Sequence, residues 1–204
     1  DKNDFDWEAL RQVTHMSVNF LDDVLDMNEY PIKKVRDTVK QIRRIGLGIM
    51  GFADALLALN IGYNTDEGVE AAERVMKFIQ QEADVASEEL AKTRGVFPAY
   101  KGSIYDKPGQ ITPRNGARTT IAPTGTIAML AETSSGCEPL FALTYAKNTI
   151  EGKRIFQTSQ YFIDALKKHF RVSSNQDLEH QLEDYSFAIE IEGQLFIRRI
   201  AGFD

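Results

Sequence analysis

The chain has 204 residues, of which 43% are hydrophobic and 26% charged, and its formal net charge is −6 at pH 7. This composition supports a core of ordinary globular size. We expect no membrane span, because no apolar run approaches the ~20 residues that cross a bilayer, and no secretory leader, because no basic-then-apolar stretch opens the sequence. The acidic balance excludes a broad basic surface for nucleic acid or an anionic membrane, so we expect a cytoplasmic protein in which any anion site is local.

Two helices are predicted at the start of the chain. Apolar residues at helical spacing indicate an amphipathic helix over about residues 5–28, which stops near Pro31. A second, more basic helix follows and runs through Val35, Val39 and Ile42. The first of these helices has one apolar face, which we expect to pack on other parts of the chain.

The strongest periodicity predicts a long helix with Asn64 or Thr65 as its N-cap and Gly95 just beyond its end. We assign its apolar stripe to core packing rather than to a dimer zipper, because the stripe is rich in Ala and ends after about three heptads. The stripe consists of Val69, Ala72, Met76, Ile79, Ala83, Ala86 and Leu90.

Residues 96–116 are rich in Pro and Gly and are predicted to form a loop. The β-branched stretch ARTTIA, residues 117–122, favours a short buried strand, after which PTGTIAMLAE, residues 123–132, turns from loop into a short helix. Farther along, PLFALTYA, residues 139–146, predicts another strand and residues 155–170 another helix.

The end of the chain has a different pattern. The stretch YSFAIEIEGQLFIRRI alternates apolar and polar residues on both sides of Glu192 and Gly193. This alternation around a turn predicts a β-hairpin.

Cysteine and histidine usage gives no metal or disulfide site. The single cysteine, Cys137, excludes an internal disulfide framework and a cysteine-based metal cluster. His15, His169 and His180 lie far apart without ligand spacing. Because the sequence begins DKNDFDWEAL, without a methionine and almost directly in a helical pattern, we expect it to be a fragment of a longer protein.

The stretch RRIGLGIMGFADALL contains Gly46, Gly48 and Gly51 in the G-x-G-x-x-G spacing of a dinucleotide-binding turn. Such a turn needs a buried strand before it and a second strand that ends in an acid about 20 residues on. Here the preceding residues are mostly polar and indicate a helix end, and Asp66 and Glu67 fall in the first turn of the long helix. We therefore predict no nicotinamide site, and assign the glycines to close strand-to-helix packing.

A second candidate is TTIAPTGTIAML, where Pro123, Thr124, Gly125 and Thr126 lie between a predicted strand and a helix start. Unpaired amides at a helix start attract anions, Gly125 allows close approach of the backbone, and the two hydroxyls add donors without charge. On its own the pattern is weak, because plain turns followed by an N-cap have the same residues.

Six polar residues allow both a functional and a structural interpretation. The acids could act as a general acid or base, but helix-end or solvated positions are favoured for them. The serines could donate to a phosphate or cap and turn the chain. The arginines could pair with a phosphate but stand at an expected helix end, where cations are favourable anyway. They are Glu132 and Glu138, Ser134 and Ser135, and Arg43 and Arg44.

The segment TTIAPTGTIAMLAETSSGCEPLFALTYAKN closely resembles the C-terminal barrel segment of ribonucleotide reductase large subunits, above all the adenosylcobalamin-dependent (class II) enzymes. The resemblance extends over roughly residues 5–162, in the family's order. Its most specific motifs are RRIGLGIMGFAD and IAPTGTIAML with SSGCEPLFAL. Class I large subunits have a similar P-T-G loop, and only the SSGCEPLFAL block favours the cobalamin enzymes.

The resemblance implies an α/β fold, the C-terminal part of a ten-stranded barrel that is rich in helices. We expect residues 1–170 to form this partial barrel domain and residues 171–204 to form a divergent tail that contains the hairpin. The loop that holds the substrate's phosphates in that family corresponds to Pro123, Thr124, Gly125, Thr126 and Ile127.

The family reduces ribonucleotides to deoxyribonucleotides for DNA synthesis by thiyl-radical chemistry. The resemblance therefore implies a ribonucleoside diphosphate or triphosphate as substrate and adenosylcobalamin as cofactor, bound mainly outside this fragment. It also implies two partners, which are the upstream segment of the same enzyme and a thioredoxin-like reductant.

The family's radical cysteine, its neighbouring catalytic residues and its reducing cysteines lie upstream of such a segment. We therefore expect no catalytic residue here, a packing role for Cys137, and no activity of the fragment alone. The alternative is a non-catalytic α/β module or remnant of the family that acts as an interaction domain.

Overall fold

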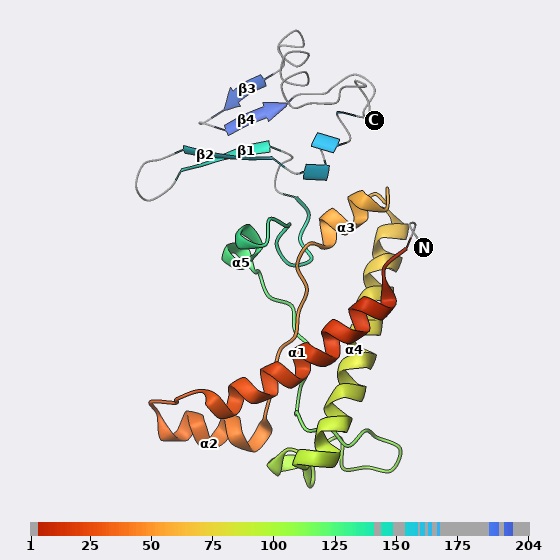
Figure 1. The fold of residues 1–204 in the computed structure, drawn as a ribbon, viewed down its shortest axis with the longest axis vertical. Helices are drawn as coiled ribbons and strands as arrows, with labels where there is room; N and C mark the ends of the chain where they lie inside the picture. Colours follow the sequence, from red (N-terminus) through yellow and green to blue (C-terminus); the bar gives the residue numbers. More distant parts are fainter. Residues whose placement is uncertain are drawn as a thin grey trace.

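The structure is a computed structural model that describes residues 4–140, 144–148, 154–158, 160, 161, 163, 164, 167, 188–191 and 194–197. Helices dominate the longest described stretch (Figure 1). They are α1 (Trp7–Met27), α2 (Lys33–Ile42), α3 (Phe52–Ala58), α4 (Asp66–Arg94), the 3-10 turn η1 (Pro98–Tyr100) and α5 (Gly125–Leu130).

The first two helices form where the sequence predicts them. The side chain of Asp6 caps α1 by accepting a hydrogen bond from the amide of Ala9 at 3.0 Å, and the extended backbone of Asn28 ends the helix. Helix α2 ends where Arg43 adopts a left-handed conformation with φ 49°. The residues before the glycine motif are therefore a helix end, as predicted.

Helix α4 has the predicted caps. The Thr65 hydroxyl accepts a hydrogen bond from the amide of Gly68 at 3.2 Å, and Gly95 ends the helix with φ 78°. The predicted stripe is wrong in its first turns, since Val69 is 66% exposed whereas Ala71 and Val75 are buried. The reason is that α3 packs against this end of α4 and takes the face that contains Ala71.

Two hydrophobic clusters hold the helices together. The first joins α1, α4 and the segment after α2 through Val18, Ile45, Ala83 and Ala86. The second joins α3 and α4 through Phe52, Leu56 and Ala71. Helix α1 therefore lies along α4 (Figure 1), and the expected core packing of α4 is confirmed.

The glycine motif lies beside the stretch that was predicted to be a strand. The amides of Ile45 and Leu47 donate to the carbonyls of Ala117 and Arg118 at 3.0 and 2.8 Å, and the amide of Thr120 donates to Leu47 at 2.9 Å. These bonds form a short parallel contact with one bridge, between Leu47 and Thr119. Residues 117–122 thus make one bridge rather than a full strand, because their only backbone partner among the described residues is this short segment.

Close packing explains the glycines, but not between a strand and a helix as predicted. A Cβ on Gly48 would lie 2.9 Å from the carbonyl oxygen of Thr120, and one on Gly46 would lie 2.8 Å from the Thr120 side chain. Two extended segments therefore approach each other here. Gly51 instead caps α3, with φ 79°.

Four strands follow α5 in the described residues. Strand β1 (Thr144–Asn148) pairs antiparallel with β2 (Arg154–Thr158), and β3 (Ala188–Ile191) pairs antiparallel with β4 (Gln194–Ile197). The predicted strand at 139–146 is confirmed at its end, and the hairpin on both sides of residues 192 and 193 is confirmed.

The helix predicted over residues 155–170 is wrong at its start. Residues 155–158 belong to β2, and helical residues follow at 160, 161, 163, 164 and 167. Pairing with β1 over five residues overrides the local helical spacing, because Arg154–Thr158 contains residues such as Ile155 and Phe156 that also suit a strand. Among the described residues, parallel pairing is limited to the one bridge, so they do not by themselves build a ten-stranded barrel.

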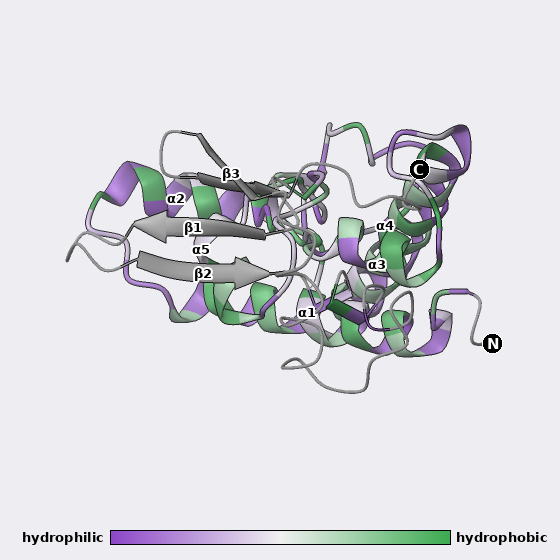
Figure 2. Cartoon of the chain, turned by 90° about the horizontal axis from the view of Figure 1, so that it is seen from above, coloured by the Kyte–Doolittle hydropathy of each residue, from purple (hydrophilic) through white to green (hydrophobic). Residues whose placement is uncertain are grey.

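Helix α1 keeps an apolar face that the described residues leave uncovered. Figure 2 shows hydrophobic and hydrophilic residues interleaved along this helix. We call the uncovered face the α1 stripe, and it consists of Val13, Met16, Phe20, Val24 and Met27.

No helix in the described part of the chain is long and apolar enough to cross a membrane.

Candidate functional site

The candidate anion loop runs from Pro123 to Ile127 and leads into α5. Thr124 precedes the helix with φ 52°, a left-handed conformation that is unfavourable for a β-branched residue. No described residue accepts a hydrogen bond from the amides of Gly125, Thr126 and Ile127. These three residues are exposed, so the loop presents unpaired amides to solvent as the sequence predicts.

Gly125 leaves open space in front of the loop. A Cβ placed on it would meet no atom within 4 Å. Helix α5 has only six residues, so the amides themselves, rather than a helix dipole, are the donors that an anion would meet. These amides can donate several hydrogen bonds to a phosphate.

The two threonine hydroxyls, for which the sequence predicts the same role, are not equivalent in the structure. The Thr124 hydroxyl oxygen accepts a hydrogen bond from the amide of Gly136 at 2.6 Å. Thr126 is exposed. Thr124 therefore holds the loop against the turn that follows α5, and Thr126 is left as the hydroxyl that faces solvent.

Residues 133–137, which we call the return turn, fold back from α5 to the candidate loop and to α3. The amide of Gly51 donates to the carbonyl of Ser134 at 2.8 Å. The amide of Ser134 donates to the carboxylate of Asp54 at 2.6 Å, and its hydroxyl accepts from the amide of Asp54 at 3.4 Å. Ser134 is buried, so its role is in the turn, which is the structural alternative of the two predicted.

The chain that enters the loop is fixed by side chains of α4. The guanidinium of Arg118 donates to Asp84 at 2.7 Å and lies over the ring of Tyr105, with 5.1 Å from its carbon to the ring centroid. The hydroxyl of Thr119 donates to Gln80. Arg118 is buried and paired, so it positions the segment before the loop and does not face a ligand.

A buried ion cluster lies behind this segment. The carboxylate of Asp22 is fully buried and pairs with Arg43 at 2.7 Å, Arg94 at 3.1 Å and Arg114 at 3.5 Å. Asn115 donates to the same carboxylate at 2.9 Å. We call these five residues the Asp22 cluster, and it joins α1, the end of α2, the end of α4 and the chain that leads to the loop.

The charges of this cluster stabilise each other. Burial alone raises the pKa of the Asp22 carboxyl, but hydrogen bonds from Arg43 and Asn115 outweigh that effect, so the pKa lies below its ordinary value. Hydrogen bonding from Arg43 likewise holds the pKa of Asp26 well below its usual range. Arg43 is therefore committed to this cluster, and the suggestion that it pairs with a phosphate is wrong.

The remaining residues that the sequence singled out take structural positions. Arg44 is exposed next to the end of α2, and Glu132 and Glu138 are exposed on both sides of the return turn. The carbonyl of Ser135 accepts a hydrogen bond from the amide of Glu138 at 3.0 Å. Cys137 is a free, half-buried cysteine that packs against the α3 cluster, as predicted.

The histidines and acids form no metal site where the structure describes them. His15 pairs with Glu82 at 2.9 Å, half-buried between α1 and α4. No group of His, Cys, Asp and Glu suited to a metal ion occurs among the described residues. His169 and His180 lie outside the described residues.

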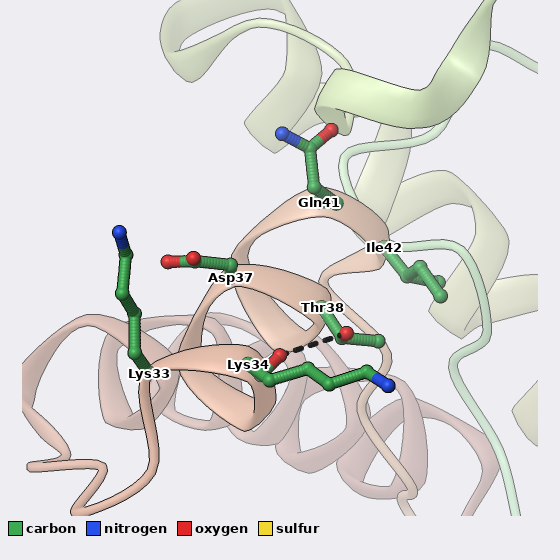
Figure 3. Close-up of a pocket in the computed structure, with 6 residues that line it drawn as sticks. All are labelled: Lys33, Lys34, Asp37, Thr38, Gln41 and Ile42. Carbon is green, nitrogen blue, oxygen red and sulfur yellow. Dashed lines mark hydrogen bonds between the residues drawn. The ribbon is translucent and has the colours of Figure 1, made fainter.

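An open hollow lies along α2, away from the candidate loop. Figure 3 shows that Lys33, Lys34, Asp37, Thr38, Gln41 and Ile42 line it. Thr38 donates to the carbonyl of Lys34 at 2.9 Å, and both lysines are solvated. Helices α2 and α5 lie well apart in Figure 1, so this hollow takes no part in the loop.

Sequence reasoning missed two buried acids, Asp22 and Asp54. Asp22 continues the buried face of α1 at a spacing of four residues after Thr14 and Val18, where a charge is unexpected. Asp54 interrupts the apolar run of α3 three residues after the glycine cap. An acidic residue on the buried face of an amphipathic helix indicates a hydrogen-bond or charge partner elsewhere in the chain. The sequence does not show which residue that partner is.

Comparison with known proteins decides the family. The profile of the family described as "Ribonucleotide reductase, barrel domain" matches residues 1–195. The chain belongs to this family. The resemblance in the glycine motif, the candidate loop and the return turn is therefore confirmed at the level of the family.

Among the similar proteins is the "Vitamin B12-dependent ribonucleoside-diphosphate reductase" of Thermoplasma acidophilum, which is 44% identical over 162 residues, covering 79% of this chain and 21% of that protein. The protein of the same description from Mycobacterium tuberculosis is 42% identical over 158 residues, covering 77% and 22%. The "Ribonucleoside-diphosphate reductase subunit alpha" of Chlamydia trachomatis is 31% identical over 199 residues, covering 80% and 19%.

The similarity is thus greater to the B12-dependent reductases than to this alpha subunit, as the SSGCEPLFAL block predicts. The chain spans about a fifth of the length of these relatives. It is one part of a ribonucleotide reductase large subunit.

Proposed function

We propose that this part of the reductase supplies the loop that holds the substrate's phosphates, formed by Pro123, Thr124, Gly125, Thr126 and Ile127. The observation that carries the proposal is the set of exposed amides from Gly125 to Ile127, which no described residue engages, in front of the open space at Gly125. Such amides donate to phosphate oxygens without a charged side chain. They can therefore form a local anion site in a chain whose net charge is negative.

The reaction that this loop serves is the reduction of a ribonucleotide to a deoxyribonucleotide for DNA synthesis by thiyl-radical chemistry. The B12-dependent relatives are ribonucleoside-diphosphate reductases by name, which favours a ribonucleoside diphosphate as substrate. The radical and reducing thiols then belong to the rest of the enzyme, with a thioredoxin-like reductant, because Cys137 is the single cysteine here and packs against α3. The fragment alone is therefore inactive.

The α1 stripe supports a role as part of a larger assembly. Met16, Phe20 and Met27 are 71%, 64% and 83% exposed. A helix of a soluble protein with such a face normally buries it against another element. We assign this face to the remaining four fifths of the reductase, whose length the relatives indicate.

Adenosylcobalamin, which the B12-dependent relatives imply, supplies the initial radical when it is bound. The described residues do not suit its binding. The hollow along α2 is an exposed helix face with two solvated lysines, and the candidate loop presents amides that suit an anion. We therefore assign the cofactor to the rest of the enzyme and no residue of this chain to it.

The proposal is tested with the assembled reductase, by which we mean this chain completed by the rest of the enzyme. Calorimetric titration with a ribonucleoside diphosphate, and separately with a triphosphate, compares the parent with Gly125→Val and Thr126→Ala. The valine fills only the space that a phosphate would occupy, so we expect a roughly tenfold or larger increase in Kd, and a smaller increase for Thr126→Ala, which loses one donor.

The matched control is Thr38→Ala, which removes an exposed threonine hydroxyl of α2 and should bind like the parent. If Gly125→Val and Thr126→Ala both bind ribonucleotide like the parent, the loop is not the phosphate site. If the assembled reductase binds no ribonucleotide at all, the interaction-module alternative is favoured.

A further inference from the structure

A buried carboxylate links α3 to the return turn. The Asp54 side chain lies on the first turn of α3, and the residue is only 7% exposed. Its Oδ2 accepts a hydrogen bond from the amide of Ser134 at 2.6 Å, and the Asp54 amide donates to the Ser134 hydroxyl at 3.4 Å. The two residues are 80 positions apart, so this pair joins distant parts of the chain.

The return turn also holds the candidate loop. The amide of Gly136 donates to the Thr124 hydroxyl oxygen at 2.6 Å. A Cβ on Gly136 would lie 2.8 Å from the carbonyl oxygen of Ala122, so the turn is packed against the residues just before Thr124. Thr124 keeps its left-handed conformation, with φ 52°, only because its surroundings impose it.

Asp54 has no cation beside it in the described part of the chain. Its carboxylate accepts a hydrogen bond there from the amide of Ser134, and its own backbone amide donates to the Ser134 hydroxyl. A carboxylate that accepts from a backbone amide makes a stronger hydrogen bond than a neutral acceptor, and leaving that buried amide unpaired is costly. The charge of Asp54 is therefore directed at the return turn.

We infer that Asp54 is a positioning residue for substrate binding, acting through Ser134 and Gly136 on Thr124 and so on the amides of Gly125 to Ile127. This inference rests on the proposed function of the loop. It gives the glycine motif a second role, because Gly51 also donates to the carbonyl of Ser134, at 2.8 Å, and caps the helix that holds Asp54. Two motifs that lie far apart in sequence thus form one substrate-holding unit.

The experiment measures steady-state kinetics of the assembled reductase carrying Asp54→Ala, with Asp54→Asn as the conservative variant. Asp54→Ala removes the acceptor, so the loop loses its fixed position. We expect KM for the ribonucleotide to rise roughly tenfold, with a much smaller change in kcat at saturating substrate. Asp54→Asn keeps an oxygen acceptor and should recover most of the parent KM.

The matched control is Leu56→Ala, on the same helix. Leu56 is 1% exposed and belongs to the apolar cluster against which Cys137 packs, but its side chain makes none of the hydrogen bonds between α3 and Ser134. Both variants are assayed at a temperature where circular dichroism shows them folded. The inference predicts a raised KM for Asp54→Ala alone. If both variants raised KM equally, Asp54 would act only by holding α3 and the inference would be wrong. If neither variant raised KM, the inference would also be wrong.

A double-mutant cycle tests the route. If Asp54 acts through Thr124, then adding Asp54→Ala to Thr124→Val raises KM much less than it does in the parent. If the fold-increases in KM of the two single variants simply multiply in the double variant, this route is contradicted.

Gly125→Val separates this inference from the proposed function. If Gly125→Val loses ribonucleotide binding while Asp54→Ala keeps the parent KM, the loop stands and the positioning role falls. If Gly125→Val binds normally, the function of the loop itself is wrong.

Discussion

The guanidinium of Arg43 donates two hydrogen bonds to one oxygen of the fully buried Asp22 carboxylate, at 2.7 and 3.0 Å. Arg43 is the residue that ends α2, and Asp22 is the last of the buried residues of α1, about one turn after Val18. The pair therefore fixes where the glycine motif begins relative to the two long helices. Removing Asp22 would leave the buried Arg43 with only the half-exposed Asp26 as its carboxylate partner among the described residues.

We expect Asp22→Ala to lower the free energy of unfolding by about 3 to 5 kcal/mol, because Arg43 remains buried without its closest carboxylate. Asp23→Ala is the matched control, since the Asp23 side chain is 52% exposed and Arg94 is its one ion-pair partner among the described residues. Its cost should stay below about 1 kcal/mol. Urea unfolding followed by circular dichroism measures both, and equal costs would show that the cluster does not hold the fold.

Acid should weaken the same cluster. The pKa values of Asp22 and Asp26 are lower in the folded protein than their ordinary values. A carboxyl whose folded-state pKa is depressed adds stability above its unfolded pKa of about 4, and this stability is lost as the pH falls toward the folded value. We therefore expect the urea midpoint to change little from these groups between pH 5 and 7 and to fall below about pH 4.

The variant Asp26→Asn checks the origin of this acid sensitivity. Asp26 is held in its charged form mainly by the hydrogen bond from Arg43. Removing the Asp26 charge should lower the urea midpoint at pH 6. It should also make the fall of the urea midpoint between pH 4 and pH 2 less steep, so that parent and variant converge in acid. Parallel pH profiles for the two proteins would contradict this assignment.

The approach of two extended segments at Gly48 predicts a graded set of alanine variants. In Gly48→Ala the new Cβ would meet the carbonyl oxygen of Thr120 at 2.9 Å, and a backbone atom cannot turn aside. We expect a loss of about 1 to 3 kcal/mol in the free energy of unfolding. Gly46→Ala should cost less, because the atom it meets belongs to the exposed Thr120 side chain, which can rotate.

Gly125→Ala is the control for this set. Its Cβ would meet nothing within 4 Å, so stability should be unchanged or slightly raised, as for other glycines replaced in a helix. Thermal unfolding ranks the three variants. A Gly125→Ala protein as unstable as Gly48→Ala would mean that the space in front of the loop is filled in solution.

The features that the sequence predicts correctly are those that depend on neighbours in the chain. The Thr65 cap and the Gly95 end of α4 are local signals, and so is the change from loop to helix at Gly125. Residues 155–158 were wrongly assigned to a helix because their strand depends on pairing with β1, which helical spacing does not reveal. The first turns of α4 were misjudged for a similar reason, since α3 decides which face is covered.

The candidate site divides in the same way. The loop was predictable, because P-T-G-T before a helix is a local pattern and the resemblance gave it a role. Its supports were not, since Asp54 meets Ser134 across 80 positions and Gly136 meets Thr124 across 12. A sequence shows that Asp54 is an odd residue in an apolar run, but only the fold brings it to the return turn.

Cys137 gives the last prediction, because it is the residue most easily mistaken for a redox thiol. It is the last residue of the return turn and is half-buried against the cluster of Phe52, Leu56 and Ala71. Its carbonyl accepts a hydrogen bond from the Tyr63 hydroxyl at 2.8 Å, which any residue at this position would keep. We therefore expect the sulfur to contribute packing rather than redox chemistry.

We expect Cys137→Ala to lower the free energy of unfolding by about 1 kcal/mol, since one small buried group is lost, and to leave the turnover of the assembled reductase within about twofold of the parent. Cys137→Ser tests the same point at nearly constant volume. Turnover assays on both variants, together with ribonucleotide titration, decide the matter. A folded Cys137→Ala enzyme that binds ribonucleotide but does not turn over would assign the sulfur to the thiol chemistry after all.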